Sequence, residues 1–301
     1  MSAPMFVFDR RAVRHHRDRA AGSLNAHDFL FHEVGKRLDD RLNDVRRTFA
    51  DVLDLGCHHG GLSQFLLARD GVRTLVQCDL SQAMVHHAPG LRVAADEEAL
   101  PFAAQSFDLV ASVLSLHWVN DLPGTLIQLR HALRPDGLLL AAILGGDTLK
   151  ELRSALAEAE LALEGGISPR VSPFAEVRDI GNLLQRAGFA LPVVDVDAIT
   201  VSYADPLRLL ADLRGMGETN AVRERRKSAS RRATLFEALD RYRRDWADAD
   251  GRIPATFQVI FLTAWAPDAS QPRPLRRGSA TTPLADALGV TEISPDGPAR
   301  S

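Results

Sequence analysis

The chain of 301 residues is poor in cysteine, tyrosine and tryptophan, and neither sign of charge dominates. Its two cysteines, Cys57 and Cys78, lie in or beside strands predicted for one sheet, so a reducing cytosol suits them better than a disulfide framework. A net charge of −3 argues against a protein that binds nucleic acid through overall positive charge. No apolar run reaches the roughly 18–20 residues that span a membrane, which leaves only peripheral membrane association open.

From residue 51 to residue 144, predicted strands alternate with predicted helices. The strands are expected at 51–56, 72–79, 91–98, 106–118 and 138–144, and the helices between them at 61–70, 80–88 and 122–134. Short connections of this kind require right-handed crossovers, so the pattern predicts an α/β fold with a parallel, doubly wound sheet.

The rest of the chain divides by composition and periodicity. The predicted regions are N-terminal helices over 1–45, an α/β core over 46–204, a helical cap insertion over 205–250, a last core strand over 251–266 and a mostly disordered tail over 267–301. The cap is expected to contain helices at about 205–214, 219–229 and 232–247. The tail is dominated by Pro, Ser, Gly and Arg, so residues 281–301 are expected to be dispensable for folding.

Three acids stand near the carboxyl ends of the first three predicted strands, beside a glycine-containing loop. Asp54 lies in the first strand, Asp79 ends the second and Asp96 ends the third. In open α/β sheets ligands bind at this edge. Asp79 is suited to accept both hydroxyls of a ribose, Asp96 to accept an adenine amino group, and Asp54 to hold the loop amides or a ligand ammonium.

An acidic pocket disfavours a pyrophosphate cofactor and suits S-adenosylmethionine, an adenosine compound with a cationic end. The spacing D-x-G-x-x-x-G at 54–60 also differs from the dinucleotide pattern G-x-G-x-x-G. The other residues predicted to bind this cofactor are Gly56, Cys57, His58, Gly60, Leu80, Glu97 and Leu114. No metal ligand is predicted.

His58 stands where the tightest loops of this kind carry glycine, which allows close backbone approach to the ligand. A histidine fits if its φ is negative and its side chain points away from the ligand. The alternative is a clash that weakens binding or alters the pose of the cofactor.

The candidate catalytic residues are His117 and Trp118, at the end of the fourth predicted strand, and Asp121, which follows it. His117 would orient or deprotonate a substrate group, because the ordinary pKa of histidine is near ~6.5. The alternative for His117 and Trp118 is packing beneath the cap, and Asp121 would equally serve as the N-cap of the next helix. His16-Arg17-Asp18 has the H-x-D spelling of an iron site, but residues i and i+2 of a helix point in different directions, so this match is taken as accidental.

Several stretches resemble the methyltransferase-fold family of the mitochondrial complex I assembly factor five. They are FDR at 8–10, EVGKRL at 33–38, AADEEALPFAAQSFDLVASVLSLHWVNDLPGTL at 94–126, GGDTLKELR at 145–153, EGGISPRVSPF at 164–174, DLRGMGETN at 212–220, DGRIPATFQ at 250–258 and RGSA at 277–280. The resemblance therefore runs over nearly the whole chain, from about Phe8 to Ala280. The chain departs from the family at His58, where the pattern expects glycine. Biotin-pathway malonyl-carrier methyltransferases look like more distant relatives.

This resemblance implies a class I S-adenosylmethionine-binding fold. It also implies a protein substrate: an arginine of a subunit of the NADH:quinone oxidoreductase (complex I), modified during assembly. In the mitochondrial protein the modification is taken to be hydroxylation, whereas methyl transfer is what the fold normally performs. The chain begins almost where the mature mitochondrial protein does, so we expect a bacterial cytoplasmic relative. Two other classes stay open: a non-catalytic assembly chaperone, and a methyltransferase of RNA, a small molecule or a carrier protein.

Overall fold

The computed structural model describes residues 6–272, 282, 286, 288 and 289. Most of the tail predicted as disordered and dispensable therefore lies outside the described residues. All of the named helices and strands belong to one compact unit that ends at Pro267.

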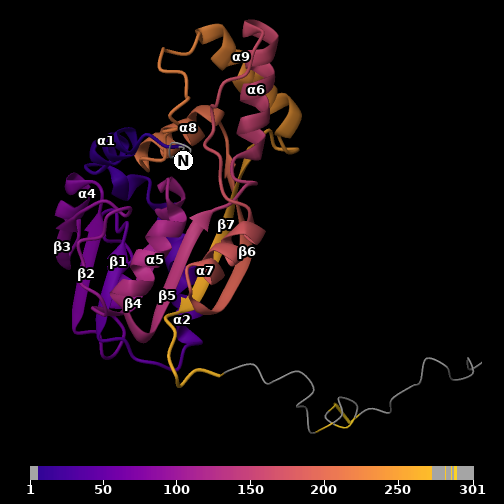
Figure 1. The fold of residues 1–301 in the computed structure, drawn as a ribbon. Coiled ribbons are helices and arrows are strands. Elements are labelled where there is room, and N and C mark those ends of the chain that lie inside the picture. Colours follow the sequence, from indigo (N-terminus) through magenta and orange to yellow (C-terminus); the bar gives the residue numbers. More distant parts are fainter. Residues whose placement is uncertain (1–5, 273–281, 283–285, 287, 290–301) are drawn as a thin grey trace, which may run out of the picture. The chain divides into compact units, whose positions relative to one another are not determined.

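Seven strands form one sheet in the order β3-β2-β1-β4-β5-β7-β6 (Figure 1). The strands are β1 (Asp51–Leu55), β2 (Thr74–Asp79), β3 (Leu91–Ala94), β4 (Phe107–Val113), β5 (Leu133–Leu144), β6 (Ala190–Tyr203) and β7 (Ile253–Trp265). The pairs among β1 to β5 are parallel, while β7 runs antiparallel to both of its neighbours. The predicted doubly wound α/β fold is confirmed.

Nine α-helices accompany this sheet among the described residues. They are α1 (Arg10–Ala20), α2 (Phe29–Asn43), α3 (Ser63–Leu66), α4 (Gln82–His87), α5 (Leu122–Ala132), α6 (Lys150–Glu164), α7 (Val177–Arg186), α8 (Pro206–Gly215) and α9 (Arg232–Trp246). A 3₁₀ turn, η2 (Leu116–Trp118), follows β4. No helix of the described part of the chain is both long and apolar enough to cross a membrane.

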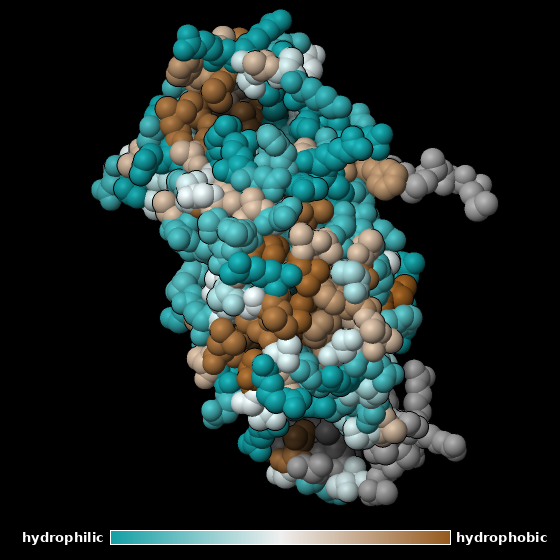
Figure 2. All heavy atoms as spheres, turned by 90° about the vertical axis from the view of Figure 1, so that its left-hand side faces the viewer, coloured by the Kyte–Doolittle hydropathy of each residue, from teal (hydrophilic) through white to brown (hydrophobic). Residues whose placement is uncertain are grey.

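Alternate residues of the central strands enter two separate apolar layers. In β4, Leu109 packs into the layer that α2 covers, whereas Val110 packs into the layer that α5 and α7 cover. Both side chains are almost completely buried, which is expected for a sheet with helices on both faces. The edge strand β3 is less well covered, and its Leu91 is exposed to solvent. On the face shown in Figure 2, hydrophilic side chains lie between the apolar patches.

The prediction of a helix over 219–229 is wrong. Val222 instead forms a bridge to Phe8, with hydrogen bonds from Asp9 N to Ala221 O and from Arg223 N to Val7 O. Helical spacing is a local signal, and here backbone pairing with a distant segment overrides it. The pairing fastens the start of α1 to the segment that follows α8.

The helices α6, α8 and α9 gather beyond one end of the sheet (Figure 1). Helix α6 packs against α9, and α8 contacts both α9 and α1. This layer therefore uses α6, which follows β5, in addition to helices of the predicted insertion. It covers the carboxyl ends of the strands, where the predicted site residues lie.

Candidate functional site

Asp54 of β1 is completely enclosed and takes its hydrogen bond from a side chain of the neighbouring strand. Gln77 Nε2 donates to its carboxylate over 2.9 Å. Burial raises the pKa of Asp54 to about 7, and the charge of Asp79 adds to that effect. The expectation that Asp54 holds the amides of the glycine loop is not met, because the loop amide of His58 donates to Asp79 instead.

Asp79, at the end of β2, is the centre of a buried polar cluster. Its carboxylate accepts hydrogen bonds from the backbone amides of His58 at 3.0 Å and Ser81 at 2.8 Å. Arg17 Nη1, which comes from α1, lies 3.1 Å from each of its two oxygens. A guanidinium thus occupies the position beside Asp79 that the sequence assigns to ribose hydroxyls.

Glu97 shares the same guanidinium. It lies 3.0 Å from Arg17 Nη1, and Ser115 Oγ donates to it over 2.8 Å. Arg10 binds both Glu97 and its neighbour Asp96. Burial alone would raise the pKa of Glu97, but the charges of Arg17 and Arg10 outweigh it and lower the pKa. Both predicted acids after β3 are therefore already paired with cations of α1.

Arg17 was not predicted as a site residue. It lies between His16 and Asp18, whose H-x-D spelling is taken as an accidental match to an iron site. The signal was available in the helical spacing, since Val13, Arg17 and Ala20 share one face of α1 and each is at most 2% exposed. An arginine on an apolar helix face must find buried carboxylates, and the sheet supplies them.

His58 has a φ of +50°, so the condition of a negative φ is not met. The loop adopts the left-handed conformation that glycine favours and places the amide of His58 toward Asp79. The imidazole is buried against Phe31, with ring centroids 4.2 Å apart, and its Nε2 lies 3.3 Å from Val113 O. Burial, reinforced by the charge of Arg17, lowers the pKa of His58 to about 4, so the ring is neutral near pH 7.

The chemistry of this cluster fits an adenosine compound, but its free volume does not. Carboxylates at the ends of β2 and β3 are suitable acceptors for hydroxyl and amino groups. The space left beside the loop is only about 30 Å³, which is room for one water molecule. His58 borders this space, and the Arg17 guanidinium already bonds the carboxylates of Asp79 and Glu97. The residues can hold S-adenosylmethionine only after the Arg17 guanidinium has moved away from Asp79 and Glu97.

The other predicted cofactor residues surround this cluster. Gly56 is required by its surroundings: its φ is +65°, and an added Cβ would lie 2.0 Å from Ser115 Oγ. Gly60 is also tightly enclosed. Cys57 is buried, and burial raises the pKa of its thiol. Leu80 is half-buried, and Leu114 is buried with a φ of +48°.

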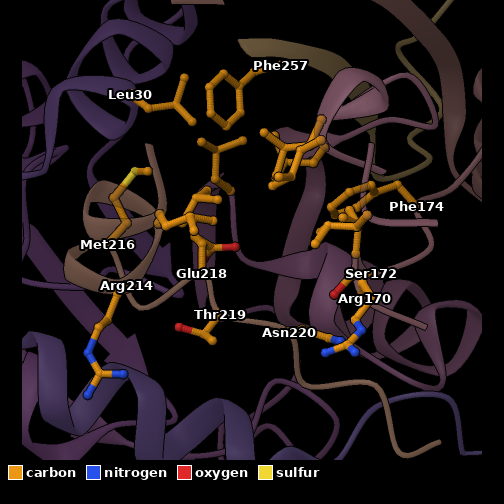
Figure 3. A pocket seen from close by; sticks show the side chains of 18 of the residues that line it. Leu30, Arg170, Ser172, Phe174, Arg214, Met216, Glu218, Thr219, Asn220 and Phe257 are labelled. Carbon is orange, nitrogen blue, oxygen red and sulfur yellow. The ribbon is translucent and has the colours of Figure 1, made fainter. Parts of the chain in front are cut away.

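A larger cavity of about 490 Å³ lies between the end of the sheet and the cap (Figure 3). Its wall is mostly apolar and includes Leu30, Leu114, Trp118, Leu144, Leu149, Leu152, Leu156, Val171, Phe174, Leu210, Leu213, Met216 and Phe257. The polar lining residues are Arg170, Ser172, Arg214, Glu218, Thr219, Asn220 and Ser230.

His117 and Trp118 lie in η2 and bind one carboxylate from the cap. His117 Nε2 is 3.1 Å from Glu218 Oε2, and Trp118 Nε1 donates to both oxygens of Glu218 at 3.2 and 3.0 Å. Glu218 was quoted only within the stretch DLRGMGETN, where nothing local marked it as a site residue. Asp121 is exposed and accepts from Gly124 N as the N-cap of α5, which is the capping role weighed for it.

Comparisons with known proteins show the family to which the chain belongs. Residues 53–141 match the family model described as a methyltransferase domain. Over 299 residues the chain is 42% identical to "Arginine-hydroxylase NDUFAF5, mitochondrial" of Danio rerio, an alignment that covers 97% of this chain and 92% of that protein. The chain belongs to the family of this arginine-hydroxylase. The protein of the same name from Homo sapiens is also 42% identical, with 97% of this chain and 86% of that protein covered.

A second group of relatives carries a different activity in its name. The malonyl-[acyl-carrier protein] O-methyltransferase of Methylovorus is 36% identical over 283 residues, covering 89% of this chain and 93% of that protein. The arginine-hydroxylase family and these methyltransferases are thus both relatives, and the named members of both groups are enzymes. The predicted family and its more distant relatives are confirmed.

Solved structures show the same fold at low identity. A putative methyltransferase from Bacillus halodurans superposes with a TM-score of 0.54 at 16% identity, covering 77% of this chain and 99% of that one. Phosphoethanolamine N-methyltransferase 2 of Haemonchus contortus, solved with S-adenosyl-L-methionine, gives a TM-score of 0.52 at 16% identity. The match covers 85% of this chain and 60% of that one. The chain has the class I S-adenosylmethionine-dependent methyltransferase fold.

Proposed function

We propose that the chain binds S-adenosylmethionine and modifies an arginine side chain of a protein, a subunit of the NADH:quinone oxidoreductase, during assembly of that complex. The modification is methylation, in which S-adenosylmethionine leaves as S-adenosylhomocysteine, or hydroxylation, which needs O2 and a two-electron reductant in addition. The named activity of the relatives at 42% identity supports arginine as the target. The class I fold supports the cofactor, and the family resemblance supports the partner. The proposed site of action is the bacterial cytoplasm.

The observation that carries this proposal is the large cavity beside the end of β4. It adjoins the turn that holds Trp118, and its volume of about 490 Å³ admits a long side chain that enters beneath the cap. His117 and Trp118 are the proposed residues at its inner end, through their contact with Glu218. Asp121 remains a proposed site residue only from its sequence position.

We propose the cofactor residues that the sequence predicts. Asp79 binds the ribose, Asp96 and Glu97 bind the base, and the loop from Gly56 to Gly60 contacts the remainder of the cofactor. S-adenosylmethionine, when bound, supplies an electrophilic methyl group. The chain's own residues orient the cofactor and the substrate, and the cap excludes water from both.

Mass spectrometry of a strain that lacks the gene tests this function. Peptides of the NADH:quinone oxidoreductase subunits should lose, at one arginine, the mass of one CH2 unit (a methyl group in place of a hydrogen atom) or of one oxygen atom. A plasmid copy of the gene should restore it. Arginine peptides of equal mass in both strains would refute the proposed activity.

A non-catalytic assembly chaperone is the second candidate, and one observation favours it. Only about 30 Å³ is free beside the loop, and the Arg17 guanidinium already bonds both carboxylate oxygens of Asp79. This candidate predicts that the deletion strain accumulates incompletely assembled oxidoreductase, while no arginine changes mass. The same mass measurement therefore separates the two functions.

A further inference from the structure

Glu218 stands at the boundary between the glycine-loop cluster and the large cavity. On one side it lies 3.1 Å from His117 Nε2, with Arg17 and His58 close by. On the other side, it is the acidic member among the described residues that line the cavity. Figure 3 shows its carboxylate directed into the space between the lining side chains.

This carboxylate is buried and ionised. Its side chain is 7% exposed. Burial would raise its pKa, but the hydrogen bond with His117, together with nearby positive charge, lowers the pKa below its ordinary value. A buried charge is costly unless it is paired, and His117 and Trp118 supply that pairing, which keeps a negative charge at the apolar cavity wall.

Its acceptor capacity is not filled. A carboxylate offers roughly four acceptor sites. Oε2 takes one hydrogen bond from Trp118 and one contact with His117, whereas Oε1 takes only the longer bond from Trp118, at 3.2 Å. Oε1 therefore retains room for a donor that enters from the cavity.

The charges at the rest of the cavity do not compete for this position. Arg170 is held by Glu160, at 2.7 Å from its Nη2, and by Ser230. Arg214 is exposed on the helix α8, where water screens its charge. Around Glu218 the walls are formed by Leu114, Trp118 and Phe174, which suit an aliphatic stem and the flat face of a guanidinium.

We infer that Glu218 is the specificity-determining residue of this cavity and binds the guanidinium of the substrate arginine, an inference that rests on the proposed function. The guanidinium donates to Oε1, while Trp118 and His117 hold the carboxylate in place. The two groups of relatives act on groups of opposite charge, since the malonyl group ends in a carboxylate. An ionised Glu218 attracts the first and repels the second.

Binding of two small probes to the whole protein tests this assignment. N-acetyl-arginine amide carries the guanidinium, and N-acetyl-citrulline amide has the same shape without the charge. The indole N–H of Trp118 touches Glu218, so its NMR resonance, assigned by its absence in Trp118→Phe, reports on the site. The arginine probe should shift this resonance in a saturable way, and the citrulline probe should bind at least about tenfold more weakly.

Glu218→Gln keeps the shape and removes the charge, so it should weaken the arginine probe by about tenfold or more and abolish the preference over citrulline. Glu224→Gln, at an exposed position of the following segment, is the matched control and should bind as the wild type does. If Glu218→Gln does not fold, the comparison of the two probes on the wild-type protein decides. Equal binding of both probes to the wild type, or unchanged binding to a folded Glu218→Gln, would overturn the assignment.

The outcome is distinguishable from failure of the proposed function. Probe binding that depends on Glu218, combined with arginine peptides of equal mass in the deletion strain, would refute the activity and leave the guanidinium site standing. An arginine that changes mass in the deletion strain, combined with equal binding of both probes, would overturn the assignment of Glu218 alone.

Discussion

The guanidinium of Arg17 lies 3.1 Å from both carboxylate oxygens of Asp79, within a cluster that is closed to solvent. The same guanidinium contacts Glu97 and Ser115. Helix α1 thereby neutralises the acids that the sequence assigns to the cofactor. Any ligand that uses Asp79 must compete with this internal ion pair.

Replacement of Arg17 by glutamine should therefore lower the stability of the ligand-free protein but raise its affinity for the cofactor. The ligand-free variant should lose roughly 3–5 kcal/mol of unfolding free energy, because it leaves buried carboxylates without their cation. Its affinity for S-adenosylhomocysteine should rise, since the ligand no longer has to displace the guanidinium. Urea unfolding and calorimetry give the two quantities.

Arg14→Gln is the control for Arg17, because Arg14 lies on the same helix with a side chain that is 55% exposed. It should change neither quantity by more than about 0.5 kcal/mol. Weaker binding by a folded Arg17→Gln variant would show that Arg17 itself contacts the ligand.

The substitution His58→Gly should preserve or tighten cofactor binding. Glycine adopts the observed φ of +50° without the cost of about 1–2 kcal/mol that a side chain meets there, and the missing ring enlarges the space beside the loop. Loss of the packing on Phe31 and the added freedom of the unfolded chain, about 0.5–1 kcal/mol, oppose this gain, so a small loss of stability is expected.

Gln105→Gly provides the comparison for His58, because Gln105 is exposed and has a φ of +55°. The change in unfolding free energy of Gln105→Gly measures how much stability is gained when glycine relieves a positive φ outside the site. Calorimetry that shows collapsed binding in His58→Gly but not in Gln105→Gly would mean that the imidazole is a ligand contact.

Asp54 should make the stability of the protein depend on pH. Its pKa in the folded state, about 7, lies above the ordinary value of 3.8, so its contribution is fully present below about pH 4 and is lost as the pH rises through 7. Asp54→Asn keeps an acceptor for Gln77 and cannot ionise. The stability of this variant relative to the wild type should therefore increase from about pH 5 to about pH 8, as measured by urea unfolding. A difference that is the same at both pH values would contradict the raised pKa of Asp54.

His117→Ala should leave cofactor binding unchanged and slow the modification by about 10²-fold, because His117 positions the Glu218 carboxylate. The expected readouts are a normal calorimetric titration and an arginine that stays unmodified in the complemented deletion strain. His131→Ala, at an exposed position, should behave as the wild type. Full modification by a folded His117→Ala variant would make His117 a packing residue.

Local sequence patterns were enough to predict the parallel part of the sheet and to propose a site at the carboxyl ends of its strands. Alternation of apolar strands and amphipathic helices between residues 51 and 144 is a local pattern, and it predicted the parallel strands β1 to β5 and the acids Asp54 and Asp79 at their ends. The resemblance of motifs along the chain identified the family. Both predictions were possible because they depend on residues that are close in the sequence. The spacing of apolar residues within a strand or a helix follows from backbone geometry.

Which charged side chains contact one another follows from the packing of elements that lie far apart in the sequence. Arg17 and Asp79 are 62 residues apart, and His117 and Glu218 are 101 apart. No local period marks such pairs, because a buried charge takes whichever partner the packing of distant elements brings within reach. The same packing turned the expected helix at 219–229 into a segment paired with Phe8, and it thereby carried Glu218 to the end of β4.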